Sequence, residues 1–195
     1  MAVSSYMVPL GTSAPAFTLP SLDGSKVALT DFTGAPGMLV TFLCNHCPYV
    51  RHLESTLGPV LGEYAARGVG VVGICPNDTD YYLEDRPERL REQAERAGFE
   101  FPYLIDTEQD VAATYRATCT PDFFLYDADL RLAYRGAFDR ATPGNREPVT
   151  GELLTAAVEL VLAGAPVPEP HRASLGCSIK WKPGREPVGP ALRLL

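Results

Sequence analysis

The segment Met38–Leu43 constrains the fold of this chain more than any other feature. It is apolar except for Thr41 and follows the turn-forming sequence of residues 34–37. A run this short between turn signals is typical of a strand buried on both faces. From residue 50 onward apolar side chains recur at helical spacing, which predicts an amphipathic helix from Pro48 to about Arg67. A buried strand that leads directly into such a helix is typical of an α/β protein.

The rest of the chain continues this alternation. Residues 22–25 and 127–129 carry turn chemistry, and each set joins two short strands into a hairpin. Pro59 lies inside the first helix and is expected to bend it. The pattern predicts an α/β fold with a mixed central sheet flanked by helices and an N-terminal β-hairpin. Further strands are expected at residues 17–19, 26–29, 69–74, 103–105, 123–126 and 132–135, and further helices at 87–97, 108–115 and 151–163.

Length and proline content predict the domain organisation. A chain of 195 residues with 46% hydrophobic residues can bury one core and is short for two ordinary domains. We therefore predict one domain over residues 1–163. Residues 164–195 are rich in proline and are expected to form an extended tail. Its apolar segment, residues 175–181, is expected to dock back on the domain.

Charge and hydropathy exclude some classes of partner. The chain has 17 basic and 24 acidic residues and a net charge of -7, without a basic block. Nucleic acid and anionic membranes are therefore not expected as partners. No apolar run approaches the roughly 20 residues of a membrane span, and the N-terminus lacks the pattern of a signal peptide. We expect a cytoplasmic protein, and no feature indicates an oligomeric state.

The sequence Cys44-Asn45-His46-Cys47-Pro48 lies between the predicted strand and helix. A thiol at a helix N-terminus meets free backbone N–H groups and the positive end of the helix dipole, which favour its thiolate. This context predicts a redox pair. Cys44, expected to be the more exposed, attacks a disulfide, and Cys47 resolves the mixed disulfide. The predicted function is thiol–disulfide oxidoreductase, with a protein or small-molecule disulfide as substrate and a thiol as electron donor.

Other residues are candidates for supporting roles. Asn45 and His46 are expected to tune the thiolate, and His46 in particular to lower the pKa of Cys44. Cys75 is interpreted as a buried structural thiol, whereas Cys119 and Cys177 are candidate auxiliary thiols. The charged run at residues 84–96 is interpreted as a solvated helix face.

Four stretches of the chain resemble a known family: Cys44–Val50, Cys119–Phe124, Tyr134–Gly136 and Gly176–Trp181. Together they resemble the redoxin (AhpC/TSA-like) branch of the thioredoxin-like superfamily, and more closely a bacterial group that carries Cys-Asn-His-Cys-Pro-Tyr-Val. The resemblance implies the thioredoxin fold. It also implies that Pro121 is a cis-proline facing the cysteine pair, and that the Thr120 backbone receives an extended substrate segment. Thioredoxins bury an acid where this chain has Met38.

Two other functions remain open. A peroxiredoxin-like peroxidase would use Cys44, and Thr41 fits the Pro-x-x-x-Thr-x-x-Cys spacing. Gly37, however, occupies the proline position, and Pro121 stands where the resemblance places an arginine. A thiolate metal-binding module would use Cys44, Cys47, His46 and a tail thiol, but no second Cys-x-x-Cys or His pair completes four ligands. We expect neither a metal nor an organic cofactor.

Overall fold

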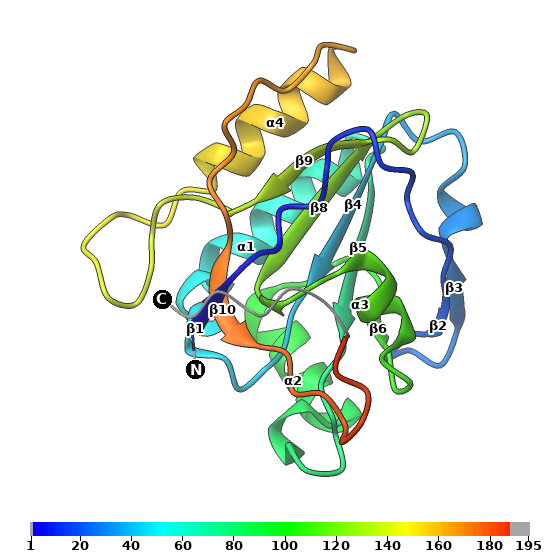
Figure 1. The fold of residues 1–195 in the computed structure, drawn as a ribbon, viewed down its shortest axis with the longest axis vertical. Coiled ribbons are helices and arrows are strands. Elements are labelled where there is room, and N and C mark those ends of the chain that lie inside the picture. The colour runs from blue at the N-terminus through cyan, green and yellow to red at the C-terminus, as the bar shows by residue number, and fades with distance from the viewer. Residues whose placement is uncertain (1, 188–195) are drawn as a thin grey trace.

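The computed structural model describes residues 2–187 (Figure 1). The end of the predicted tail, residues 188–195, lies outside the described residues. The strands are β1 (Ala2–Ser4), β2 (Thr18–Pro20), β3 (Lys26–Ala28), β4 (Gly37–Phe42), β5 (Gly70–Cys75), β6 (Tyr103–Ile105), β7 (Cys119–Thr120), β8 (Asp122–Asp127), β9 (Leu132–Gly136) and β10 (Leu175–Ser178). The helices are α1 (Pro48–Ala66), α2 (Pro87–Ala97), α3 (Asp110–Tyr115) and α4 (Glu152–Leu162), with short 3₁₀ turns η1 (Leu29–Phe32) and η2 (Leu83–Asp85).

Five strands form the central sheet in the order β6-β5-β4-β8-β9. β4 runs parallel to β5 and antiparallel to β8, so the sheet is mixed. All six residues of β4 are buried, because the strand is central and helices or loops cover both faces. The predicted mixed α/β fold with its N-terminal hairpin, here β2–β3, is confirmed.

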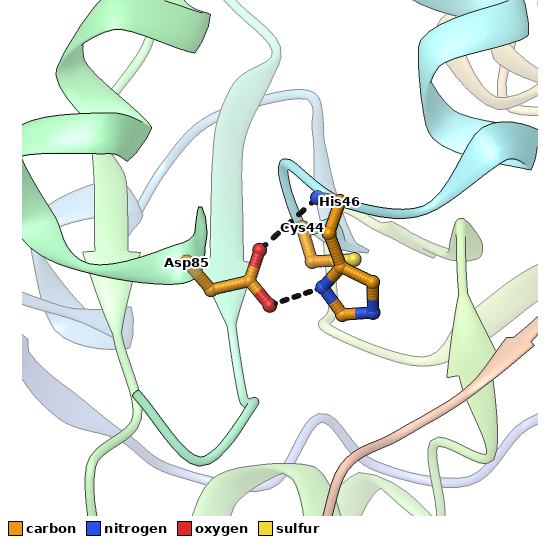
Figure 2. A group of neighbouring side chains, drawn as sticks. All are labelled: Cys44, His46 and Asp85. Carbon is orange, nitrogen blue, oxygen red and sulfur yellow. Dashed lines mark hydrogen bonds and ion pairs between the residues drawn. The ribbon is translucent and has the colours of Figure 1, made fainter. Parts of the chain in front are cut away.

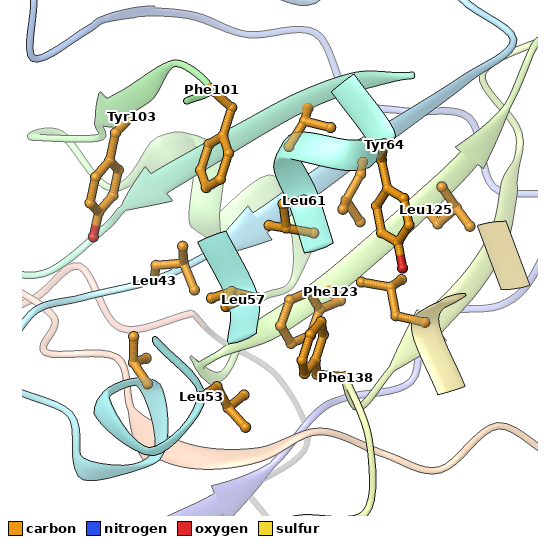
Figure 3. Close-up of a cluster of buried hydrophobic side chains, with 14 of the residues drawn as sticks. Leu43, Leu53, Leu57, Leu61, Tyr64, Phe101, Tyr103, Phe123, Leu125 and Phe138 are labelled. Carbon is orange, nitrogen blue, oxygen red and sulfur yellow. The ribbon is translucent and has the colours of Figure 1, made fainter. Parts of the chain in front are cut away.

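Two apolar layers enclose this sheet. On one face α1, α2 and α4 contribute side chains such as Leu57, Leu90 and Leu154 to one apolar cluster. Figure 3 shows Leu43, Leu57 and Phe123 of this cluster close together. On the other face the hairpin and α3 cover a second apolar layer. Its aromatic side chains include Phe17, Phe42, Tyr115, Phe124 and Tyr126. Because apolar layers pack on both faces of the sheet, β4 is held firmly in place. The loop that follows β4 is therefore held in place as well.

Helix α1 begins at Pro48, as predicted, and contains Pro59 without a break in its assignment. The adjacent Gly58 allows a close helix–helix approach, because a Cβ placed there would lie 1.8 Å from the carbonyl oxygen of Ala97 at the end of α2. Helix α3 starts at Asp110, later than predicted. Gln109 has a positive φ of 62°, and the carboxylate of Asp106 accepts a hydrogen bond from the Ala112 N–H.

A second sheet lies beside the cysteine loop. β10 pairs antiparallel with β1 on one side and with β7 on the other, in the order β1-β10-β7. Figure 1 shows the blue β1 and the orange β10 next to each other near the start of α1. The sequence did not predict β1, and β10 lies within the segment expected to dock. Across residues 2–187, every helix is too short or too polar to cross a bilayer.

Candidate active site

The end of β4 and the start of α1 position the two cysteines of the motif. Cys44 lies two residues beyond β4, whereas Cys47 is the N-cap of α1 and precedes Pro48 in the first helical position. The unpaired N–H groups and positive dipole end of the helix therefore act mainly on Cys47. The sequence interpretation gave this environment to Cys44, although the helix start that it predicted at Pro48 places Cys47, not Cys44, at the N-cap.

Both cysteines are completely buried, with 0% of each side chain exposed. The expectation that Cys44 is the more exposed is therefore wrong. Burial raises the pKa of Cys44 well above its ordinary value, and the nearby Cys47 and Asp85 add to the increase. The net pKa of Cys44 is therefore raised and not lowered, with loss of hydration as the largest influence. The lowering contribution expected of His46 stays a prediction.

Thr120 lies between the two sulfur atoms. Its hydroxyl oxygen is 3.1 Å from Cys44 Sγ, and its carbonyl oxygen is 3.0 Å from Cys47 Sγ. The peptide bond between Thr120 and Pro121 is cis. The structure thus brings Thr120 and Pro121 to the cysteine pair, although they are more than 70 residues away in the sequence.

Two influences act in opposite directions on Cys47. The carbonyl oxygen of Thr120 favours a protonated thiol, because a thiol can donate a hydrogen bond to it. The thiols of Cys177 and Cys44 can instead donate to a Cys47 thiolate, and they lower its pKa in that order. The helix N-terminus also favours the anion, and the pKa of Cys47 is lowered while that of Cys44 is raised.

Cys177 reaches this site from β10. In the antiparallel pairing of β10 with β7, Cys177 lies opposite Thr120. The Thr120 backbone is therefore already paired within the chain. Strand-like docking of a substrate at Thr120 stays a prediction, and it would require β10 to move aside.

Asp85 organises the loop between the cysteines, and the sequence interpretation missed it. This fully buried carboxylate accepts hydrogen bonds from the backbone N–H groups of Asn45 and His46 at 2.8 and 3.2 Å. Its second oxygen lies 2.6 Å from His46 Nδ1 and accepts a bond from the Asn77 side chain at 2.8 Å. Figure 2 shows Asp85 facing His46, with the sulfur of Cys44 beside the imidazole ring. A nucleophile, an imidazole and an orienting carboxylate in this order can move a proton from Cys44.

Asn45 supports the loop and does not face either sulfur. Its side chain donates to the Glu84 carbonyl at 2.8 Å and accepts from Arg96 at 3.0 Å. Gln93 of α2 donates to the carbonyl oxygen of Cys44 at 3.1 Å. The interpretation of residues 84–96 as a solvated face is therefore wrong for one side of α2, because Gln93 is fully buried there. A polar helix gave no sequence signal for that inward-facing amide.

The two remaining cysteines are buried thiols. Cys75 ends β5, and burial raises its pKa well above the ordinary value. Cys119 lies on β7, its sulfur is 3.5 Å from the Pro121 carbonyl oxygen, and burial raises its pKa as well. Both are 0% exposed, which argues against either as the first nucleophile for an external disulfide.

The residues Cys44, His46 and Asp85 could offer three metal ligands, since one ligand atom of each lies within 4.8 Å of the others. The carboxylate of Asp85, however, is already committed to the four contacts from Asn45, His46 and Asn77. A bound cation would have to replace these contacts. The donor set therefore fits a hydrogen-bonded network better than a metal centre.

A family comparison matches residues 10–135 of the chain to the model of the AhpC/TSA family. Among curated relatives, a Mycobacterium tuberculosis protein provisionally named a peroxiredoxin is 32% identical over 107 residues, which is 55% of this chain and 63% of the relative. The thiol–disulfide oxidoreductase ResA of Bacillus thuringiensis is 26% identical over 123 residues, which is 63% of this chain and 66% of ResA. The alignments thus span slightly less than two thirds of these relatives.

Among solved structures, an uncharacterised conserved protein of Geobacillus kaustophilus is 46% identical, with a TM-score of 0.91 over 94% of this chain and 98% of its own. The thioredoxin domain of a thiol–disulfide oxidoreductase from Bacteroides vulgatus superposes with a TM-score of 0.58 at 21% identity, over 77% of this chain and 99% of its own. The second likeness shows the thioredoxin-like fold.

Proposed function

Since the chain belongs to the AhpC/TSA family, whose chemistry is thiol-based, we propose that it is a thiol–disulfide oxidoreductase working through Cys44 and Cys47. The oxidoreductase name of the ResA relative supports this choice. The finer assignment, to the bacterial group with the sequence of residues 44–50, stays part of this proposal.

One observation carries the proposal: the two sulfurs converge on a single residue. Cys44 Sγ and Cys47 Sγ lie 3.1 and 3.0 Å from two oxygens of Thr120, and each thiol affects the pKa of the other. Thiols this close can close a disulfide with little movement of the backbone. The loop that carries them is held by Asp85 and Gln93, which limits the entropy lost on closure.

The proposed exchange has two steps. The thiolate of Cys47 attacks one sulfur of a substrate disulfide, and the other substrate sulfur leaves as a thiolate that takes up a proton. Cys44 then attacks the Cys47 sulfur of the mixed disulfide, which releases the second substrate thiol and leaves a Cys44–Cys47 disulfide. The substrate gains two electrons, which the two cysteines lose. A thiol donor reverses both steps.

His46 has the proton-transfer role in this scheme. The pKa of Cys44 is raised, so its attack requires a base to take the thiol proton. His46 lies beside Cys44 and is oriented by Asp85 through its Nδ1 atom. The imidazole accepts the proton as Cys44 attacks and later delivers it to the departing thiolate.

The test is to titrate the reduced protein with glutathione disulfide, trap the thiols and map the bonds by mass spectrometry. We expect a reversible Cys44–Cys47 disulfide and catalysed insulin reduction with dithiothreitol. Cys44→Ser and Cys47→Ser should each lose insulin reduction by at least tenfold, whereas Cys75→Ala should keep it. Absence of the Cys44–Cys47 disulfide in the wild-type protein would contradict the proposal.

Peroxidase activity is the second candidate, and the provisional peroxiredoxin name of the Mycobacterium relative favours it. The side-chain oxygen of Thr41 is buried and has no hydrogen-bond partner within residues 2–187. Arg51 and Arg96 both donate hydrogen bonds to Asn45, the residue that follows Cys44. Hydrogen peroxide added to reduced protein distinguishes the two functions: Thr41→Val should slow a peroxidase and leave disulfide exchange unchanged.

A further inference from the structure

β10 places a third sulfur beside the cysteine pair. We propose that Cys177 is a redox-active thiol that exchanges with a low-molecular-weight disulfide and passes the oxidation on to Cys47. This inference rests on the proposed function, since it supplies the route by which the external disulfide reaches the buried pair.

The position of β10 brings Cys177 to Cys47. Cys177 lies opposite Thr120 in the strand pairing, and the carbonyl oxygen of Thr120 is 3.0 Å from Cys47 Sγ. Cys177 packs against the core cluster that contains Cys44 and Cys47. It has the largest effect on the lowered pKa of Cys47, and Cys47 in turn has the largest effect on the raised pKa of Cys177. Gly176 permits this close approach, because a Cβ at that position would lie 2.1 Å from the Thr120 oxygen.

Exposure distinguishes Cys177 from the other cysteines. Cys44, Cys47, Cys75 and Cys119 are all 0% exposed, whereas Cys177 is partly exposed. A disulfide arriving from solvent therefore meets Cys177 before it can meet Cys47. In the closed structure a direct attack by Cys47 on an external disulfide would require β10 to leave β7 first.

A cavity next to the strand offers room for a small disulfide. It has a volume of about 370 Å³ and is lined by Pro121, Arg172 and Leu175, among other residues. Leu175 and Cys177 are two residues apart on β10, so their side chains point to the same face of the strand. The positive charge of Arg172 in this lining suits a carboxylate of a peptide-like ligand such as glutathione.

The relay balances over three exchanges. Cys177 attacks the external disulfide, and its proton passes to the first external thiolate, which leaves as a thiol. The Cys47 thiolate attacks the Cys177 sulfur of the mixed disulfide and releases the second external thiolate. Cys44, deprotonated by His46, attacks Cys47 and releases the Cys177 thiolate. The Cys177 thiolate takes up the proton held by His46, so Cys177 is restored as a thiol. In total, Cys44 loses one proton, and Cys44 and Cys47 together pass two electrons to the external disulfide, which leaves as one thiol and one thiolate.

Three variants trap the intermediates with glutathione disulfide as the probe. In Cys44→Ser the last step is blocked, and we expect a Cys47–Cys177 disulfide. In Cys47→Ser the second step is blocked, and we expect glutathione bound to Cys177. Cys177→Ala should slow oxidation of the Cys44–Cys47 pair by at least tenfold, while Cys119→Ala, a buried thiol on the paired strand β7, serves as the matched control and should oxidise at the wild-type rate.

Two results would overturn the inference. One is Cys44→Ser protein with glutathione on Cys47 and a free Cys177. The other is a wild-type oxidation rate in both Cys177→Ala and Cys177→Ser. Two substitutions are used so that a packing effect of one of them is not mistaken for a redox effect. These outcomes are separate from a failure of the proposed function, because they leave the Cys44–Cys47 disulfide of the wild-type protein in place.

Discussion

At the scale of single residues, Asp85 acts both on the thiol of Cys44 and on the imidazole of His46. Its carboxylate is fully buried, orients His46 and accepts two backbone N–H groups of the cysteine loop. The same negative charge contributes to the raised pKa of Cys44. Asp85 is therefore a positioning residue with two opposite effects, since it disfavours the Cys44 thiolate and orients the base that removes the proton.

We predict that Asp85→Asn separates these effects. Loss of the charge should lower the pKa of Cys44, measured as the pH dependence of iodoacetamide alkylation in a Cys47→Ser, Cys177→Ser background. The new amide N–H₂ would face the donating side-chain amide of Asn77, which should cost about 1–3 kcal/mol in the free energy of unfolding. An unchanged alkylation profile would exclude an electrostatic role for Asp85.

Asp122 is a second buried acid, one residue beyond Pro121, and burial raises its pKa from 3.8 to about 7. Since the folded-state pKa lies above the unfolded value, the associated stability is complete below about pH 4 and is lost as the pH rises through 7. The loss should reach at most about 4 kcal/mol. Urea unfolding should show Asp122→Asn gaining stability relative to wild type between pH 4 and pH 8. A difference that does not vary with pH would contradict this assignment.

At the scale of secondary-structure elements, the contact between α1 and α2 supports the site. α2 supplies Gln93, which donates to the Cys44 carbonyl oxygen, and Arg96, which pairs with Glu54 of α1 at 3.0 Å. Gly58 allows the two helices to approach this closely. A change in the spacing of α1 and α2 should therefore alter the position of the cysteine loop as well as the packing of the core.

Two glycines of α1 provide a matched test of this contact. Gly58→Ala places a Cβ 1.8 Å from the backbone oxygen of Ala97 and should destabilise the fold by about 2 kcal/mol or more. Gly62→Ala has only the flexible Glu100 side chain nearby, at 3.9 Å, and should gain about 0.5–1 kcal/mol from helix propensity. Thermal or urea unfolding measures both. Equal effects of the two substitutions would show that the helix contact does not depend on Gly58.

At the scale of the whole molecule, residues from both ends of the described chain close the site. β10 lies between β1 and β7, and Cys177 faces Thr120 across the pairing. The central sheet contains neither β1 nor β10. The strands that cover the site are thus separate from the central sheet that supports it. A substitution in β10 can therefore open the site without unfolding the central sheet.

We predict that Gly176→Ala opens the site and leaves the fold intact. The added Cβ would lie 2.1 Å from the Thr120 carbonyl oxygen and should displace β10 from β7. Alkylation of Cys44 and Cys47 by iodoacetamide should accelerate by at least tenfold, while the far-ultraviolet circular dichroism stays unchanged. Gly144→Ala, which has nothing within 4 Å, is the control. Unchanged protection of both thiols in Gly176→Ala would show that β10 does not cover the pair.

Much of the fold could be predicted because it depends on local patterns. The apolar run of β4, the helical periodicity of α1 and the turn residues of both hairpins are short-range signals. The three residues of β1 carry no comparable signal. They form a strand only because β10 supplies the pairing partner, more than 170 residues away in the chain.

The sequence by itself determined the mixed α/β fold and the place of Cys44 and Cys47 between a strand and a helix, because hydrophobic periodicity and the strand–helix junction are properties of neighbouring residues. The tertiary structure alone decided the environment of the two thiols. Their burial, the carboxylate of Asp85 beside His46 and the sulfur of Cys177 beside Cys47 all come from segments distant in sequence. A thiol pKa depends on hydration and on charges and donors within a few ångströms, and these are fixed only when the chain has folded.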